Sequence, residues 1–345
     1  VEGRADGIFT EDGKCFVDEI KGMYRKVELF EKPVFVHRAQ AMCYAYIFAL
    51  QNNMETIGIQ MTYCNLETEQ TKYFREGFSF EEIKKWFDDL MEEYGKWATF
   101  QCEMKNQRQA SIKELNFPFE YRPGQKKLVS DVYRTIMRQK LLFMQAPTGV
   151  GKTISTIFPA VKAVGEELAD RIFYLTAKTI TATVAKETFA LLEKNGYRAK
   201  TIQITAKEKL CPCDEMECNP VTCPYAKGHF DRVNDAVFDL LHRCEMIERD
   251  DILSQADRYT VCPFELCLDT ASWCDNIICD YNYVFDPNVY LKRFFQEGIK
   301  GDYIFLIDEA HNIVERSRQM YSAQIYKQDF LTVKRIMKEH SRSIE

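Results

Sequence analysis

Hydrophobic and polar residues alternate in two different ways along this chain, and the change occurs near residue 105. Before it, ADGIF and KCFVDEIKG flank the sequence EDGK, in which Asp12-Gly13 is typical of a two-residue β-hairpin loop. HRAQAMCYAYIFALQNN has a helical pattern, whereas IGIQMTYC and KYFREGF have the pattern of strands. Ser79 and Glu82 form a capping-box pattern ahead of a helix with an apolar stripe. The pattern predicts a small αβ domain over residues 1–105.

Beyond this domain, a polar stretch leads to two prolines in KNQRQASIKELNFPFEYRPGQ, and apolar strands then alternate with helices. The strands are expected at KLLFMQA, RIFYLTA and YIFLIDEA. Such alternation is typical of a parallel sheet covered by helices on both faces. We therefore predict an α/β domain over residues 106–345, with a cysteine-rich insertion at 205–265 and the start of a helical insertion after 315.

Composition places the chain among globular proteins, because 46% of its 345 residues are hydrophobic and 28% are charged. No apolar run approaches the roughly twenty residues that cross a bilayer, so we expect a cytoplasmic protein. Thirteen cysteines without a secretion signal disfavour a disulfide framework. The net charge of -6 excludes a generally basic nucleic-acid coat but leaves a local basic groove open. Because VEGRADGIF begins like a strand, we expect a fragment that starts inside a domain.

The segment APTGVGKT follows the first of these expected strands and precedes a helical pattern, as a phosphate-binding loop requires. Gly149 and Gly151 allow backbone amides to face phosphate oxygens at a helix N-terminus. Lys152 would reach the terminal phosphates, and Thr153 would hold magnesium. The alternative, an ordinary glycine-bearing turn, does not explain why all these features occur together.

The strand in YIFLIDEAH ends in two adjacent carboxylates, Asp308 and Glu309. The carboxyl ends of parallel strands face the ligand crevice of such sheets. Asp308 would hold the magnesium ion, and Glu309 would polarise the attacking water. A solvated acidic turn is the alternative, and the phosphate loop argues against it.

APTGVGKT followed by DEAH resembles the superfamily-two helicases, and YRPGQ, LTAKT and DEAHN resemble the XPD/DinG family within them. The resemblance covers residues 117–345 and implies a RecA-like motor domain that uses ATP to translocate on single-stranded DNA. It also implies that residues 176–179 lie near the DNA backbone and that Arg122 and Gln125 contact the adenine region. The implied nucleotide-binding set is Arg122, Gln125, Thr148, Gly149, Gly151, Lys152 and Thr153, and the implied catalytic set is Lys152, Asp308, Glu309 and His311.

Four cysteines occur within LCPCDEMECNPVTCPY, between LTAKT and DEAH, where XPD-like helicases carry a four-iron four-sulfur cluster. The family resemblance implies Cys211, Cys218, Cys223 and Cys262 as ligands. Four thiolates suit either an iron–sulfur cluster or zinc, so the spacing alone does not choose between them. A local set with Cys213 in place of Cys262 would be more typical of zinc.

Three further cysteines, Cys267, Cys274 and Cys279, have apolar neighbours and are expected to be small buried core residues. Tyr281 and Tyr283 follow them in ICDYNYVFDP. Base stacking in a single-strand channel is one role for these tyrosines. Ordinary packing in the fold is the favoured one.

In the predicted hairpin, Asp6 falls directly opposite Glu19, and Lys21 lies on the same strand face as Glu19. Two facing carboxylates repel each other unless a positive group lies between them. The arrangement suits a Mg²⁺ or Mn²⁺ ion for phosphodiester hydrolysis, with Lys21 near the attacking water or the scissile phosphate. A solvated hairpin face is the alternative.

GRADG, DEIKG and QAMCYAY resemble the PD-(D/E)XK nucleases of the RecB-like type. The family's Gln-x-x-x-Tyr helix corresponds to Gln40 and Tyr44, which share one helix face. The resemblance covers residues 1–105. The upstream helix that such nucleases usually have, and the histidine that they often carry, are not found in the chain.

These patterns together predict an ATP-dependent DNA helicase of repair or recombination with a fused metal-dependent DNA nuclease domain. The expected partners are ATP and single-stranded or forked DNA, and the expected location is the nucleoid. In one alternative the nuclease-like domain only binds DNA; in another, the protein is a zinc-stabilised, ATP-dependent scaffold. No second motor half is found after DEAHN.

Overall fold

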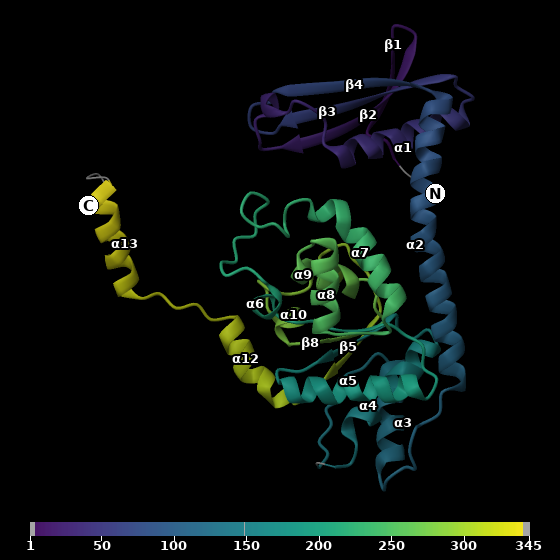
Figure 1. Ribbon diagram of the computed structural model, residues 1–345, viewed down its shortest axis with the longest axis vertical. Helices are drawn as coiled ribbons and strands as arrows, with labels where there is room; N and C mark the ends of the chain where they lie inside the picture. Colours follow the sequence, from purple (N-terminus) through teal and green to yellow (C-terminus); the bar gives the residue numbers. More distant parts are fainter. Residues whose placement is uncertain (1–3, 148, 341–345) are drawn as a thin grey trace. The chain divides into compact units, whose positions relative to one another are not determined.

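The computed structural model describes residues 4–147 and 149–340 (Figure 1). The chain divides into two compact units, Val1–Cys102 and Glu103–Glu345. The division falls inside a long helix, α2 (Phe80–Glu114). Each unit contains a β-sheet and its own hydrophobic core. None of the helices in the described part of the chain is long and apolar enough to cross a membrane.

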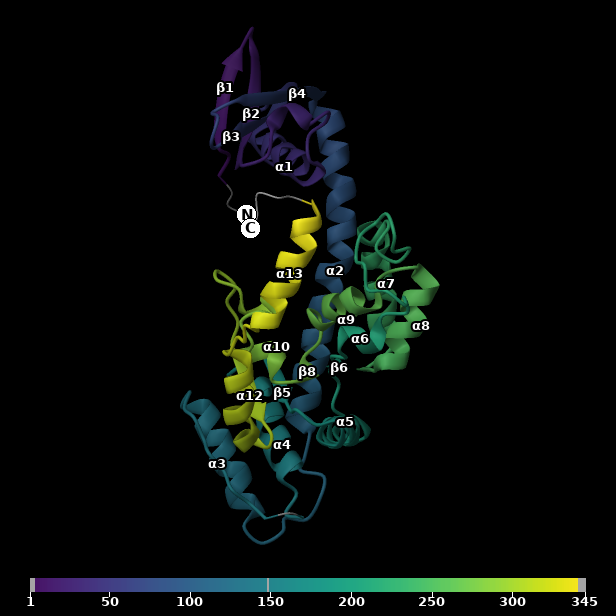
Figure 2. The ribbon, with the colours of Figure 1, turned by 90° about the vertical axis from the view of Figure 1, so that its left-hand side faces the viewer.

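The first unit is a four-stranded mixed sheet with one helix packed against it. The sheet order is β1-β2-β3-β4; β1 and β4 pair antiparallel with their neighbours, and β2 pairs parallel with β3. The strands are β1 (Gly7–Glu11), β2 (Lys14–Met23), β3 (Thr56–Asn65) and β4 (Thr71–Ser79). A 3-10 turn, η1 (Val27–Leu29), and helix α1 (Phe35–Gln51) separate β2 from β3, and α1 lies along one face of the sheet (Figure 2).

Local sequence signals account for this unit. Asp12 and Gly13 have φ angles of 50° and 74°, as the tight hairpin turn between β1 and β2 requires. At the start of α2, the Ser79 amide donates to Glu82 Oε2 at 2.8 Å and the Glu82 amide donates to Ser79 Oγ at 3.3 Å. The hairpin, the helix, both later strands and the capping box predicted from the sequence are therefore confirmed.

The second unit contains a five-stranded sheet with the order β7-β6-β8-β5-β9, in which all paired strands run parallel. The strands are β5 (Arg171–Leu175), β6 (Thr201–Gln203), β7 (Met246–Ile247), β8 (Asn276–Cys279) and β9 (Tyr303–Ile307). Helices α3 (Gln125–Met137), α4 (Lys152–Gly165) and α5 (Thr179–Lys194) precede or connect the first of them. The parallel sheet expected from the alternating pattern is confirmed.

Both faces of this sheet are covered. Ile172 and Tyr174 of β5 belong to a core that includes buried residues of α4 and α5, which lie below the sheet in Figure 1. Phe173, which alternates with them, packs on the other face against Phe294 and Phe295 of α11 (Lys292–Phe295). The near-continuous apolar sequence of β5 is explained by this burial on both sides.

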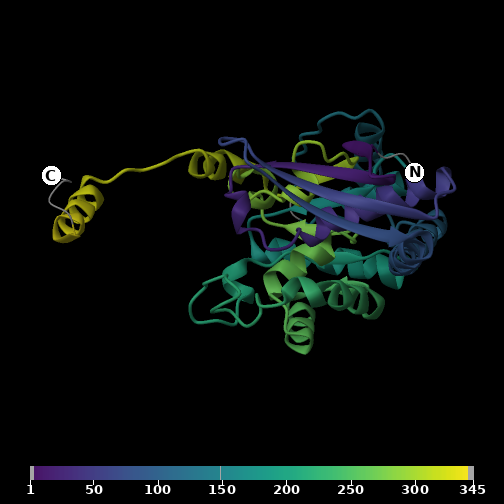
Figure 3. The same cartoon turned by 90° about the horizontal axis from the view of Figure 1, so that it is seen from above.

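The cysteine-rich insertion is mainly helical. Its helices are α6 (Lys207–Leu210), α7 (His229–Arg243), α8 (Arg249–Tyr259) and α9 (Pro263–Ala271), which gather into one group (Figure 2). The segment between α6 and α7 extends from this group as an irregular loop (Figure 3). The remaining elements are α10 (Asn282–Phe285), η2 (Ala310–Asn312), α12 (Ile313–Met320) and α13 (Lys327–His340).

One predicted strand is wrong. Residues 140–147, which include KLLFMQA, form neither strand nor helix, and Leu141 and Phe143 are 89% and 88% exposed. In this structure β9 is the edge of the sheet, and no strand pairs with its outer side. An apolar run becomes a strand only where another strand pairs with it, and the hydrophobic pattern carries no information about that partner.

Candidate functional site

The phosphate loop is held by Arg122, which precedes α3, and by Gln125, the first residue of α3. Gly149 and Gly151 have φ angles of 84° and 75°, and Gly151 is the N-cap of α4. The Arg122 guanidinium donates a hydrogen bond to the Gly149 carbonyl, and Gln125 Nε2 donates to the Val150 carbonyl at 3.1 Å. Both expected adenine-contacting residues thus brace the loop itself in this structure.

Gln125 lies close to the loop at Gly151, where an added Cβ would be 2.8 Å from Gln125 Nε2, whereas no described residue other than the chain neighbours lies within 4 Å of a Cβ added at Gly149. Lys152 and Thr153 are the first residues of α4, so the free amides of the helix N-terminus point toward the loop. Thr148, the other expected nucleotide-binding residue, lies outside the described residues.

The two expected carboxylates follow β9. The Asp308 amide donates to the Leu175 carbonyl at 3.0 Å, which continues the pairing of β9 with β5. The Glu309 amide donates to Asp308 Oδ1 at 3.0 Å, and Glu309 adopts a left-handed φ of 50°. His311 Nδ1 lies 3.4 Å from Glu309 Oε2. The DEAH sequence is thus a tight turn at the carboxyl end of a parallel strand.

Tyr174 brings these two motifs together, although sequence reasoning gave it no role. Its hydroxyl is in hydrogen-bonding contact with both Thr153 and Asp308. Burial, and then the Asp308 carboxylate, raise the pKa of Tyr174 well above its ordinary value. Thr153 and Asp308 therefore both lie next to the Tyr174 side chain, and oxygen ligands of this kind fit a magnesium ion.

The cysteines of the loop between α6 and α7 lie close together. Cys213 contacts both Cys223 and Cys211 through side-chain hydrogen bonds. Partial burial, and then these two neighbours, raise the pKa of the Cys213 thiol to about 11. Cys213 therefore lies inside the cysteine group, although the expected ligand set omits it.

Lys207 connects this group to the more distant cysteine. A hydrogen bond to Cys218 is the main reason why the pKa of Lys207 is raised, and Cys218, Cys262 and Cys211 add to it through their charges. All four expected ligands therefore neighbour either Lys207 or Cys213. Among the described residues, no three His, Cys, Asp or Glu side chains already form a metal-binding group. The donor chemistry fits an iron–sulfur cluster or zinc, as the sequence had left open.

Cys262 is the N-cap of α9. Burial raises the pKa of its thiol, while the backbone amides of Phe264 and Glu265 oppose this effect. A helix N-terminus favours a thiolate, which is the form of cysteine that binds metals.

The other cysteines and tyrosines of this region are core residues. Cys267, Cys274 and Cys279 are 0%, 1% and 3% exposed, which confirms their predicted structural role. Tyr281 and Tyr283 are 0% and 8% exposed. Packing, rather than base stacking, is therefore their role in this structure, and Tyr281 also donates a hydrogen bond to the Asp308 carbonyl.

The first unit brings its own predicted residues together. The register pairs Gly7 with Asp18, so Asp6 and Glu19 are the next two facing positions. Asp6 Oδ2 accepts a hydrogen bond from the Ile20 amide at 2.8 Å. Glu19 is only 1% exposed and its carboxylate forms an ion pair with Lys21, and among the described residues no other group donates a hydrogen bond to either carboxylate oxygen. A buried carboxylate without hydrogen bonds is costly unless a cation compensates it.

The α1 residues complete this cluster. Gln40 Oε1 accepts a hydrogen bond from Lys21 Nζ at 3.4 Å. The hydrogen bond to Glu19 is the main cause of the raised pKa of Lys21; burial opposes it, and the charges of Glu19, Asp6 and Tyr44 support it. The five residues predicted from two separate sequence patterns therefore lie in one place.

Sequence reasoning missed His37 and Tyr63. Tyr63 is the register partner of Lys21, and its hydroxyl accepts the Val34 amide at 2.9 Å and lies 3.1 Å from His37 Nδ1. Burial, and then the nearby Lys21, lower the pKa of His37. The sequence feature that could have identified His37 is its position about one helical turn before Gln40, on the same face of α1.

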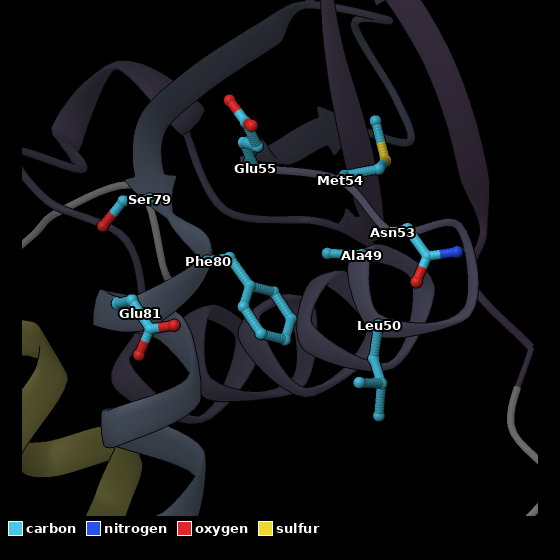
Figure 4. A pocket seen from close by; sticks show the side chains of 8 residues that line it. All are labelled: Ala49, Leu50, Asn53, Met54, Glu55, Ser79, Phe80 and Glu81. Carbon is cyan, nitrogen blue, oxygen red and sulfur yellow. The ribbon is translucent and has the colours of Figure 1, made fainter.

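A separate cavity of about 400 Å³ lies at the other end of this sheet (Figure 4). Its lining comes from the C-terminus of α1, the connection between α1 and β3, and the junction of β4 with α2: Ala49, Leu50, Asn53, Met54, Glu55, Ser79, Phe80 and Glu81. Lys21 pairs with Tyr63 near the far end of β3, so this cavity is not part of the carboxylate cluster.

Comparisons with known proteins concern mainly the second unit. Residues 186–330 match the DEAD_2 family model. This range of the chain includes the four expected cysteine ligands and the DEAH sequence. The chain is 19% identical over 281 residues to regulator of telomere elongation helicase 1 of Rattus norvegicus, covering 66% of this chain and 22% of that protein. It is 24% identical over 232 residues to the general transcription and DNA repair factor IIH helicase subunit XPD/RAD3 of Saccharomyces cerevisiae, covering 57% and 29%.

Among solved structures, one named XPD_Helicase aligns with a TM-score of 0.40 and 19% identity, over 57% of this chain and 34% of that one. The chain spans 22% and 29% of the lengths of the two curated relatives. By sequence, the chain is similar to XPD-like superfamily-two DNA helicases, whose chemistry uses ATP.

Proposed function

We propose that the second unit is the first motor domain of an ATP-dependent DNA helicase that moves along single-stranded or forked DNA in repair or recombination. This proposal rests mainly on one observation: Thr153 and Asp308 both interact with the Tyr174 side chain. It joins the phosphate loop to the DEAH turn, as a nucleotide-hydrolysing site requires. The DEAD_2 match and the similarity to DNA helicases support the same function. A location at the nucleoid is part of this proposal.

Each residue has a role in this proposal. The amides around Gly149 and Gly151 cradle the phosphates, and Lys152 neutralises their terminal charge. Thr153 and Asp308 would hold Mg²⁺, which neutralises negative charge on the transferring phosphoryl group. Glu309 would orient the attacking water, next to His311.

The decisive test uses a protein that contains this chain together with a second motor domain, which we call the full-length parent. ATP turnover should rise when single-stranded DNA is added, and Lys152→Ala should abolish this turnover because the phosphate charge is no longer neutralised. Lys194→Ala, at the last residue of α5, is a matched control that should leave turnover unchanged. Tight ATP binding without any DNA-stimulated turnover would instead support the scaffold alternative.

The cysteine group is part of the same proposal. Cys211, Cys218, Cys223 and Cys262 would hold a [4Fe–4S] cluster, supported by the family resemblance and by their common neighbours Lys207 and Cys213. Such a cluster would stiffen the loop between α6 and α7, since metal binding and local folding are coupled. Anaerobic protein should contain iron and acid-labile sulfide; stoichiometric zinc without sulfide would favour the alternative.

For the first unit we propose metal-dependent cleavage of DNA. The supporting observation is Glu19, a buried carboxylate beside Asp6 whose polar partner among the described residues is Lys21. Asp6 and Glu19 would hold Mg²⁺ or Mn²⁺, and Lys21, oriented by Gln40, would face the attacking water or the scissile phosphate. The runner-up is a DNA-binding module without catalysis, which would bind DNA but leave it intact in either metal.

A further inference from the structure

A buried histidine, His229, connects the two chain segments that carry the expected cysteine ligands. It is the first residue of α7, six positions after Cys223, and it is 4% exposed. Its Nδ1 atom lies 3.2 Å from the backbone nitrogen of Cys262, which donates to it. The loop that ends in Cys223 is thus tied directly to the N-cap of α9.

The protonation of His229 follows from these contacts. A backbone amide can only donate, so Nδ1 must carry the lone pair and the proton must reside on Nε2. Nε2 is buried without a hydrogen-bond partner and lies 3.9 Å from Asp269 Oδ2.

Arg293 forms hydrogen bonds with two acidic side chains of α9. Arg293 Nη2 donates to Asp269 Oδ1 at 2.7 Å and to Glu265 Oε2 at 3.0 Å. Asp269 is therefore held near His229 from the opposite side, in the manner of a carboxylate that orients a histidine.

Arg232, nearly one turn after His229, strengthens the same junction. Its guanidinium donates to the carbonyls of Tyr259 at 2.9 Å, Thr260 at 2.6 Å and Lys227 at 2.8 Å. These bonds bring the end of α8 to the start of α7. The position of Cys262 beside the loop cysteines thus depends on a small set of polar contacts with His229 at its centre.

We infer that His229 is a positioning residue that fixes Cys262 as the fourth ligand of the metal group, in preference to Cys213. This inference rests on the proposed metal site. The His229 imidazole accepts the Cys262 amide from the segment that carries Cys223, so it links the backbone of the N-cap residue to the loop cysteines. Partners of this kind around a metal site typically change metal affinity about 10–100-fold when they are removed.

The test compares three variants of the chain, purified without oxygen. His229→Leu removes the acceptor, His229→Gln retains an oxygen that can accept the Cys262 amide, and His242→Leu is a control at an exposed position of the same helix. Iron, zinc and sulfide are measured, followed by the rate of metal loss to a chelator. Alkylation of Cys262 and Cys213 by iodoacetamide is followed by peptide mass spectrometry, and thermal unfolding reports whether each variant folds.

We expect His229→Leu to lose metal about 10–100-fold faster and to expose Cys262 to alkylation, while His229→Gln and His242→Leu resemble the unmodified chain. The inference is overturned if His229→Leu keeps its metal and a protected Cys262, if His229→Gln fails as badly as His229→Leu, or if Cys213 is the protected thiol throughout. Zinc without sulfide in the unmodified chain would refute the iron–sulfur assignment but not the role of His229. The variants would then be compared in the same way for their zinc content and zinc loss. An unmodified chain without metal and with reactive cysteines would refute both.

Discussion

Glu19 is the residue whose surroundings most clearly require a partner that the chain itself does not supply. Lys21 is its ion-pair partner, but the Lys21 side chain is 29% exposed and is shared with Gln40. Among the described residues, both oxygens of Glu19 are buried without a hydrogen bond to any group other than Lys21. A divalent cation between Asp6 and Glu19 would remove this cost, because it compensates both carboxylates at once.

We therefore predict that Mn²⁺ stabilises the chain and that Glu19→Gln removes this effect. A ligand that binds only the folded state at about 100 times its dissociation constant adds about 2.7 kcal/mol to the unfolding free energy. Thermal unfolding of both chains with and without Mn²⁺ measures this difference, and Glu67→Gln, in an exposed turn, is the control.

In the full-length parent, Glu19→Gln should also abolish DNA cleavage while DNA binding survives. If Mn²⁺ and Mg²⁺ leave the unfolding temperature of the unmodified chain unchanged and no DNA is cut, the binding-module alternative replaces the nuclease.

At the scale of elements, the C-terminal part of α2 is anchored to the parallel sheet by a buried ion pair. Arg108, 8% exposed, bonds to the Asp275 carboxylate and to the Asp170 carbonyl at 3.2 Å. Asp275 precedes β8, and its other oxygen accepts the Lys200 amide at 2.8 Å. The pair thus joins α2 to the segments that precede β5 and β8.

Arg108→Met should lower the free energy of unfolding by about 3–5 kcal/mol, because it leaves the buried Asp275 carboxylate without its cation. Lys105→Met, in the same helix, removes an exposed ion pair with Glu167 and should cost about 1 kcal/mol or less. Chemical unfolding followed by circular dichroism compares the two. Equal effects would show that the Arg108 pair adds nothing beyond a surface contact.

At the scale of the whole molecule, the described residues contain one parallel sheet with a phosphate loop and one DEAH turn. In helicases of the proposed class, ATP lies between two such domains, and the second supplies an arginine that stabilises the transferring phosphoryl group. In related phosphoryl-transfer sites that arginine accelerates the reaction on the order of a thousandfold or more.

The 345-residue chain should therefore bind nucleotide through Lys152 and Thr153 but show no DNA-stimulated ATP turnover. The full-length parent should show such turnover. Steady-state assays of both proteins, with and without single-stranded DNA, make the comparison. Robust stimulated turnover by this chain alone would mean that it assembles a complete site without a second domain.

Features that depend on neighbouring residues were predictable from the sequence. The Asp12-Gly13 turn and the Ser79/Glu82 capping box form as expected because they depend on backbone preferences and on contacts within one helical turn. Glu19 and Lys21 were placed correctly because a short hairpin loop sets the register of its strands.

Contacts between distant segments were decided only by the tertiary structure. Tyr174 contacts Thr153 and Asp308 because β5 pairs with β9 and packs against α4. No local pattern shows that the hydroxyl of a tyrosine in an apolar strand will contact polar residues. His229 contacts Cys262 across 33 positions for the same reason.

Residues 140–146 illustrate the same point, because they have a clear apolar pattern but do not form the strand that it predicts. The sequence did not show whether a neighbouring strand would pair with them. Local sequence determines which conformation a segment prefers, through backbone sterics and nearby side chains. Which segments then lie together depends on the path of the whole chain, so the composition of each site was settled only when the chain folded.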